Sequence, residues 1–387
     1  MKTSHPFLAL FLLVLLASPT ASLAGALIID HRGTAITEIP LAAIQEAKAS
    51  LHIVYGHTSH GSQLTDGMTG LVDFANAGGK GLAHPANAFA WSNANQSPDR
   101  LHLSEALSGD CGYYPQWVNE TRTYLGAPEP GTGRGQAHPE CNVVIWSWCG
   151  QVAEKYRSGT LHSEYLTPMS SLEMDYPGVA FVYMTGHVDH WDDADNKAAN
   201  AVIRDYCQTN GKILYDFADI ESHDPDGTFY EFPNDNCDYY ASATGPWLGN
   251  WATEWQDAHT EGVDWYTCDA AHSEPLNANQ KAYAAWWLWA RLAGWPSQDI
   301  VPPTLELTVD ETTVALSWNT VPNATGYTLY YAPAPYTGPD SIQGIDMGNQ
   351  TGMSVHLWNG ASFFVAVKAY DSVGSSDYSN IEHFYIP

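Results

Sequence analysis

Basic residues are scarce in this chain of 387 residues. It carries 15 Lys plus Arg against 43 Asp plus Glu, which gives a formal net charge of −28 at pH 7. A surface this acidic repels nucleic acid and anionic membranes. We therefore expect neither as a partner. The charge suits a soluble extracellular enzyme that acts on neutral or esterified material.

Paired cysteine motifs are also missing. None of the six cysteines belongs to a Cys-x-x-Cys pair, which argues against a zinc ribbon or a thioredoxin-like site. In an exported chain six cysteines favour disulfides, although the sequence does not decide which of them pair. The pairs that we favour are Cys111 with Cys141 and Cys237 with Cys268.

Long apolar runs are absent except near the start of the chain. Lys2 precedes an apolar run at 7–16, and small residues at 21–24 form a cleavage site, so we expect residues 1–24 to be a removable secretory signal. A membrane anchor needs about 20 apolar residues, and the Ser-Pro-Thr segment 18–20 interrupts this run too early. No Cys follows the cleavage site, which argues against a lipoprotein. We expect a secreted or periplasmic protein.

Between residues 51 and 293, short apolar runs alternate with helical patterns, which is typical of βαβ units around a mainly parallel sheet. Strands are expected at 51–55, 88–91, 143–148, 179–185 and 212–217. Helices are expected at 63–76, 115–125, 165–174, 195–209 and 277–292, the last of them capped by Asn277. We predict a three-layer α/β/α domain over residues 25–298 with a five-stranded parallel sheet. Two irregular stretches, 92–140 and 221–267, are expected to shape a substrate cleft.

The composition changes at the Pro-rich segment 301–303. Alternating apolar residues follow at 305–309, 314–318 and 327–331, a pattern of short strands that indicates a β-sandwich over residues 299–387. This part resembles a fibronectin type III domain, in which Trp318 would be the core Trp and the segment 370–374 the last hairpin. The resemblance implies a spacer or a carbohydrate-binding accessory rather than a catalytic unit.

A serine follows the first expected strand. Residues 56–62 read Gly-His-Thr-Ser-His-Gly-Ser and lead into a helix. At the carboxyl end of a parallel strand the Ser59 hydroxyl would face the cleft, and its own N–H, at a helix start, could donate to a developing oxyanion. The alternative is that Ser59 or Ser62 only caps the helix.

The segment Asp269-Ala270-Ala271-His272 lies just before the last expected helix. On such a loop the imidazole of His272 could reach a serine, while Asp269 orients the other ring nitrogen. Together with Ser59, these two residues would form a catalytic triad.

These two segments resemble the SGNH (GDSL-like) hydrolase and esterase superfamily, in a divergent variant. The resemblance covers residues 48 to 295 and implies a flavodoxin-like fold, with Ser59 as the nucleophile and Ser62 as the fallback. It places Gln151 as an oxyanion donor, although Cys149 stands where the family has Gly. A further backbone donor would be Gly109 or Gly112.

Histidines follow the first and fourth expected strands at the same edge of the sheet. We expect them to contact substrate or to form hydrogen bonds, and they include a cluster that could instead hold a catalytic metal. The spacing fits no standard zinc signature, so no metal and no cofactor are predicted. The candidate substrate-binding residues are His57, His60, His187, His190 and Trp148.

The sequence thus predicts a secreted serine esterase that removes acetyl-type acyl groups from polysaccharides or related esters. Two alternatives stay open: a non-catalytic carbohydrate-binding protein on a degenerate hydrolase scaffold, and a metal-dependent hydrolase that uses His187 and His190.

Overall fold

A computed structural model describes residues 26–94, 97, 99–295, 300–322, 324–338, 341–370 and 375–387. The expected signal segment 1–24 lies outside these ranges, as do the end of the expected hairpin at 371–374 and the boundary between the two units at 296–299. No helix in the described ranges is long and apolar enough to cross a membrane.

A seven-stranded sheet organises the first unit, and every pair of neighbouring strands in it is parallel. The prediction of a parallel α/β unit is confirmed at this level. The strands, in their order across the sheet, are β1 (Leu27–Ile29), β9 (Ile213–Tyr215), β8 (Ala180–Met184), β7 (Val143–Trp146), β2 (His52–His57), β4 (Leu101–Ser108) and β3 (Trp91–Ser92).

Three strand predictions were wrong. The sheet has seven strands rather than five, because β1 was not expected and β4 lies in a stretch assigned to an irregular insertion. The strand expected at 88–91 is only the two-residue edge strand β3. Several residues of β4 are partly or fully exposed, because this strand lies near the edge of the sheet. The four residues of the central strand β7 are all buried.

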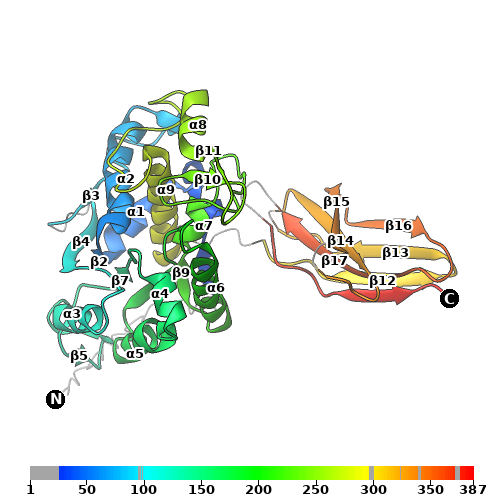
Figure 1. The fold of residues 1–387 in the computed structure, drawn as a ribbon, viewed down its shortest axis with the longest axis horizontal. Helices are drawn as coiled ribbons and strands as arrows, with labels where there is room; N and C mark the ends of the chain where they lie inside the picture. Colours follow the sequence, from blue (N-terminus) through cyan, green and yellow to red (C-terminus); the bar gives the residue numbers. More distant parts are fainter. Residues whose placement is uncertain are drawn as a thin grey trace, which may run out of the picture.

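Helices cover both faces of the sheet (Figure 1). On one side α1 and α2 pack against α9, and on the other α3 packs against α5 and α4 against α6. Gly67 lets α2 approach α9, because a Cβ at this position would overlap the Ala278 carbonyl. The helices are α1 (Leu41–Ser50), α2 (Ser59–Asn76), α3 (Gln116–Leu125), α4 (Val152–Arg157), the π-helix η4 (His162–Leu166), α5 (Thr167–Asp175), α6 (Asp193–Thr209), α7 (Phe217–Glu221), α8 (Trp251–Ala258) and α9 (Pro275–Leu292).

The start of α9 differs from the prediction. The N-cap is Glu274, and Pro275 takes the first helical position, where the lack of an N–H costs nothing. Asn277 lies inside the helix, and its amide donates to the Ser273 hydroxyl at 2.7 Å. Asn277 is therefore not the cap.

The second unit is a β-sandwich, drawn to one side of the α/β unit in Figure 1. Its two antiparallel sheets enclose a separate apolar core that contains Trp318, as predicted. The first sheet runs β12 (Leu305–Asp310), β13 (Thr313–Trp318) and β16 (Gly352–His356), and the second runs β15 (Gln343–Gly348), β14 (Gly326–Pro333), β17 (Ser362–Tyr370) and β18 (Glu382–Tyr385).

The expected disulfides are not formed. All six cysteines lie in the described ranges, and all are free thiols. The Cys237 thiol lies 3.2 Å from the Ser273 hydroxyl, and the Cys268 thiol accepts from the Asn279 amide. In the other favoured pair, the Cys141 thiol donates to the Val143 carbonyl at 3.6 Å. The pairings Cys111–Cys141 and Cys237–Cys268 are therefore corrected.

Candidate functional site

The candidate site lies at the carboxyl edge of the parallel sheet, where β2, β7 and β8 end. The turn after β2 passes directly into α2, so Ser59 is the first residue of an 18-residue helix. The first N–H groups of a helix have no intrahelical acceptor and carry partial positive charge. This turn therefore presents a hydroxyl and N–H donors together.

Ser59 and His272 meet across 213 residues of sequence. The Nε2 atom of His272 lies 3.0 Å from the Ser59 hydroxyl, as expected for a nucleophile and its base. A hydrogen bond joins the loop that carries His272 to α2: the Gln63 amide donates to the Ala271 carbonyl at 2.5 Å. His272 itself has a φ of +64°, a left-handed conformation uncommon outside glycine.

Asp269 does not complete the expected triad in this structure. It is exposed, and within the described residues no hydrogen bond joins it to the His272 ring. Asp235 lies near the ring: one of its carboxylate oxygens is within 4.8 Å of a His272 nitrogen, and likewise of a His60 nitrogen. The carboxylate near the imidazole thus comes from the irregular stretch 221–267, where the sequence offered no motif to single out Asp235.

Ser62, the fallback nucleophile, faces elsewhere. Its hydroxyl donates to the Asp66 carboxylate at 2.8 Å and to the Ser59 carbonyl at 3.0 Å. It lies one turn into α2 and makes no hydrogen bond with His272 among the described residues. The geometry therefore favours Ser59.

Gly61 allows the turn after β2 to lie against the end of β7. A Cβ on Gly61 would overlap the side chain of Ser147, so any larger residue would push the two segments apart. Because they are close, the Cys149 thiol lies 3.9 Å from the Ser59 hydroxyl.

Cys149 also belongs to a hydrogen-bonded chain with His60 and Asp235. The Nδ1 atom of His60 lies 3.2 Å from the Cys149 sulfur, and its Nε2 atom lies 3.1 Å from the Asp235 carboxylate. The hydrogen bond from His60 lowers the pKa of Cys149 to about 7, although burial opposes this shift. Burial alone would lower the pKa of His60, but its bonds to Asp235 and Cys149 outweigh this effect and raise it to about 9.

The expected oxyanion donors surround a buried carboxylate. The Gly112 N–H donates to Asp110 at 2.9 Å, and the Gln151 amide donates to the same carboxylate at 3.4 Å. The Thr58 hydroxyl is a third donor, at 2.9 Å. A Cβ on Gly112 would overlap the amide end of the Gln151 side chain, which would then have to move away. Gly109, with a φ of +86°, lies in the turn just before.

The other candidate histidines differ in position. His57 turns to the Glu105 carboxylate at 2.8 Å. The buried His187 ring stacks on His60, with centroids 3.8 Å apart, while His190 stacks on Tyr240 at 3.6 Å. His60 also stacks on His272 at 4.5 Å, so three imidazoles form a column beside Ser59.

Trp148 was expected to contact substrate, and the structure corrects this. Its side chain is 2% exposed, and its indole N–H donates to the Met184 carbonyl at 3.0 Å. The ring packs edge-on against Tyr165. Trp148 is thus part of the core beneath the site.

Among the described residues, neither His187 nor His190 belongs to a group of three possible metal ligands. In the described part of the chain, ligand atoms approach within 4.8 Å of one another in two other groups: His60 with Asp235 and His272, and His31 with Asp219 and His223. Within each group one pair is already hydrogen-bonded: His60 with Asp235 at 3.1 Å, and His31 with Asp219 at 2.5 Å.

A buried ion pair supports the loops of the site. The Lys281 ammonium of α9 lies 2.5 Å from the Glu221 carboxylate, and both side chains are at most 1% exposed. Lys281 also donates to the Gln63 amide oxygen, and Glu221 accepts from the Val188 N–H at 2.8 Å. Gln63 holds the loop of His272, and Val188 follows His187. This pair could not be predicted from the sequence, because Lys281 and Glu221 lie 60 residues apart and no motif links them.

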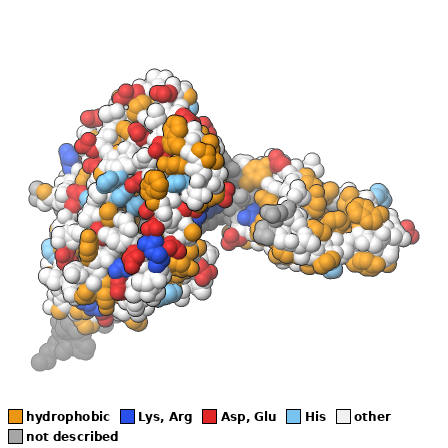
Figure 2. All heavy atoms as spheres, in the orientation of Figure 1, with side chains coloured by type: hydrophobic (Ala, Val, Ile, Leu, Met, Phe, Trp, Pro, Cys, Tyr) orange, Lys and Arg blue, Asp and Glu red, His pale blue; other side chains and the backbone are white. Residues whose placement is uncertain are grey.

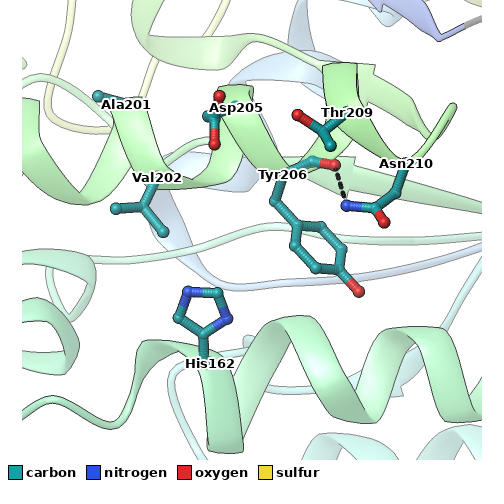
Figure 3. A pocket seen from close by; sticks show the side chains of 7 residues that line it. All are labelled: His162, Ala201, Val202, Asp205, Tyr206, Thr209 and Asn210. Carbon is teal, nitrogen blue, oxygen red and sulfur yellow. Dashed lines mark hydrogen bonds between the residues drawn. The ribbon is translucent and has the colours of Figure 1, made fainter.

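Histidine side chains gather on one face of the α/β unit, beside hydrophobic side chains (Figure 2). A separate hollow of about 410 Å³ lies between α6 and the start of η4, and no residue of the Ser59 site lines it (Figure 3). One of the side chains that line it is used locally, since the Asn210 amide donates to the Tyr206 carbonyl at 2.8 Å.

No protein-family profile and no curated protein matches the chain. Solved structures of fibronectin type III-like domains do match part of it. The human collagen alpha-1(XX) fn3 domain is 23% identical, with a TM-score of 0.21, and the match covers 24% of this chain and 92% of that one. A Fn3-like protein from Clostridium thermocellum is 21% identical, with a TM-score of 0.20, over 23% of this chain and 95% of that one.

The FN1-FN3 domains of chicken CNTN1 are 19% identical, with a TM-score of 0.20, and the match covers 22% of this chain and 30% of that one.

Proposed function

We propose that the protein is a secreted serine ester hydrolase of the SGNH type, in which Ser59 is the nucleophile and His272 the general base. The observation that carries this proposal is the 3.0 Å contact between the Ser59 hydroxyl and His272 Nε2. We also propose that residues 1–24 are removed on export.

The proposed reaction is acyl transfer in two steps. His272 Nε2 takes the Ser59 proton while the Ser59 oxygen attacks the ester carbonyl, and the alcohol leaves with that proton. Water, deprotonated by the same nitrogen, then releases the acid. N–H groups of the first turn of α2 donate to the oxyanion. Asp235, with a carboxylate oxygen within 4.8 Å of a His272 nitrogen, offsets the positive charge on His272.

The strand order supports the SGNH type. β2, the first of the five central strands in the chain, lies between the second, β4, and the third, β7, and β8 and β9 follow outward. This is the order of flavodoxin-like doubly wound sheets, which bind ligands at the carboxyl ends of their strands. Ser59 follows β2 at that edge.

Exposed aromatic residues favour carbohydrate esters as substrates. Trp191, directly after His190, is 80% exposed, and Trp247 in the irregular stretch 221–267 is 57% exposed. Flat indole faces suit stacking on sugar rings, and the net charge of −28 favours uncharged substrates. Acetylated polysaccharides therefore fit the proposal.

One observation favours a second candidate, a carbohydrate-binding protein on an inactive hydrolase scaffold. Gly112 and Gln151, the expected oxyanion donors, are already hydrogen-bonded to Asp110. In that case Ser59 would bind a sugar hydroxyl rather than attack an ester.

A fluorophosphonate probe tests the proposal. Wild type and the matched control Ser62→Ala should label at similar rates, and both should hydrolyse nitrophenyl acetate, whereas Ser59→Ala should do neither. Asp235→Asn should lower kcat/KM by about 100-fold or more, and the exposed Asp269→Asn by much less. Labelling of Ser59→Ala at the wild-type rate, or none in wild type, contradicts the proposal.

A further inference from the structure

We propose that Cys149 is a second nucleophilic centre beside Ser59, a site at which peroxides modify the protein. Its effect on catalysis rests on the function proposed above, whereas its reactivity does not. The chain from Cys149 through His60 to Asp235 places a thiol, an imidazole and a carboxylate in the order found where histidine activates a cysteine.

Each member of this chain comes from a different segment. Cys149 follows β7, His60 is the second residue of α2, and Asp235 lies in the stretch 221–267. His60 is buried, whereas Cys149 is partly exposed, so the sulfur can meet a small reagent while the imidazole is shielded from water. An imidazolium next to the sulfur stabilises the thiolate, which is the reactive form.

The other five thiols lack this environment. Four of them, Cys111, Cys141, Cys207 and Cys237, are buried, and burial raises the pKa of each. The fifth, Cys268, is partly exposed like Cys149, but burial of its sulfur raises its pKa to about 12. Cys268 is thus the natural internal control.

An unpaired nitrogen of His187 points to what the site would hold. Its Nδ1 lies 2.6 Å from the Val188 carbonyl and must donate to it, so in the neutral ring Nε2 is an acceptor. That Nε2 is buried and has no partner in the described part of the chain. It lies 3.9 Å from where a Cβ would stand on Gly150, the residue after Cys149. The hydroxyl of a sulfenic acid on Cys149 is a donor that could satisfy it.

The chemical step is a two-electron oxidation. The Cys149 thiolate attacks one peroxide oxygen, an S–O bond forms, and the O–O bond breaks. Sulfur is oxidised to the sulfenic acid, and the peroxide is reduced to hydroxide, which takes a proton to become water. The added oxygen would lie beside the Ser59 hydroxyl, 3.9 Å from the sulfur, and obstruct the approach of an ester.

Peptide mass spectrometry of the full-length protein tests the reactivity directly. Native protein, treated with chelator and with iodoacetamide at pH 7, should be alkylated first at Cys149, well before Cys268. His60→Gln and Asp235→Asn should each slow alkylation of Cys149 by about tenfold, because a thiol with an ordinary pKa near 8.5 is far less ionised at pH 7. Equal rates at Cys149 and Cys268, or no slowing in both variants, would overturn the proposal.

Hydrogen peroxide tests the obstruction. Treated wild type should form a dimedone adduct on Cys149, lose fluorophosphonate labelling of Ser59, and regain that labelling after dithiothreitol. In Cys149→Ala, whatever labelling remains should be the same with and without peroxide. An adduct on Cys149 with undiminished Ser59 labelling overturns the obstruction, and no adduct on Cys149 overturns the whole inference. If the untreated protein fails to label at Ser59, the proposed hydrolase function is wrong. The alkylation experiment still tests the reactivity of Cys149 in that case.

Discussion

Replacing Lys281 with Met should destabilise the α/β unit by about 3–5 kcal/mol, the usual cost of removing one partner of a buried ion pair. Lys281 is 0% exposed and Glu221 is 1% exposed, with 2.5 Å between their charged atoms. Without Lys281, the Glu221 carboxylate keeps the Val188 N–H and the Asn277 amide as donors but has no counter-charge. A domain of ordinary stability has only about 5–15 kcal/mol in total.

Urea unfolding followed by tryptophan fluorescence measures this cost. All of the 15 tryptophans except Trp318 and Trp358 precede the sandwich, so the signal reports chiefly on the α/β unit. Lys197→Met is the matched control, because Lys197 pairs with Asp193 on the surface of α6 and is 44% exposed. Its loss should cost less than about 1 kcal/mol.

The double variant Lys281→Met with Glu221→Gln separates the pair from its environment. Because no unpaired charge is left, the double variant should be more stable than Lys281→Met alone. The reasoning is refuted if Lys281→Met lowers the free energy of unfolding no more than Lys197→Met does. It is also refuted if the loss in the double variant equals the sum of the losses in Lys281→Met and in Glu221→Gln, each measured alone.

Three further predictions concern packing, substrate and pH. Gly61→Ala should cost about 1–3 kcal/mol and slow fluorophosphonate labelling, since its Cβ would overlap Ser147; wild-type labelling and stability would contradict this. Trp191→Ala should raise KM for an acetylated polysaccharide by about 3- to 10-fold through loss of roughly 1 kcal/mol of stacking, and leave nitrophenyl acetate unaffected; equal effects on both substrates would refute a sugar platform. Burial opposes the shift, but the hydrogen bond to His31 lowers the pKa of Asp219 from 3.8 to about 2, so its stabilisation is present above about pH 4 and lost as the pH falls towards 2. Asp219→Asn should flatten this acid-side loss in urea unfolding, and an unchanged pH profile would contradict it.

Local signals in the sequence were enough to bring together Ser59 and His272, the proposed nucleophile and base. Ser59 follows an apolar strand and opens a helix, and His272 stands just before the helix α9. Both positions depend on near neighbours in the chain, so periodicity and helix boundaries were enough to place them at one edge of the sheet.

Contacts between residues far apart in the chain could not be predicted from the sequence. Asp235 and Asp110 lie in irregular stretches whose paths depend on tertiary packing, so no spacing ties them to His60 or Gln151. The strand β4 was missed for a related reason: its polar residues, such as His102 and Ser104, follow a stretch of sequence rich in Asn and Ser. The disulfide prediction rested on the expected compartment alone, and composition cannot specify which sulfur atoms approach each other.

The left-handed backbone of His272 limits how the loop can be improved. Glycine is the residue that adopts a φ of +64° without strain, and replacing His272 with glycine would relax the loop by an amount on the order of 1 kcal/mol. The same replacement would remove the imidazole. Stability and the proposed reactivity therefore favour different residues at position 272. A variant engineered for heat resistance should keep His272.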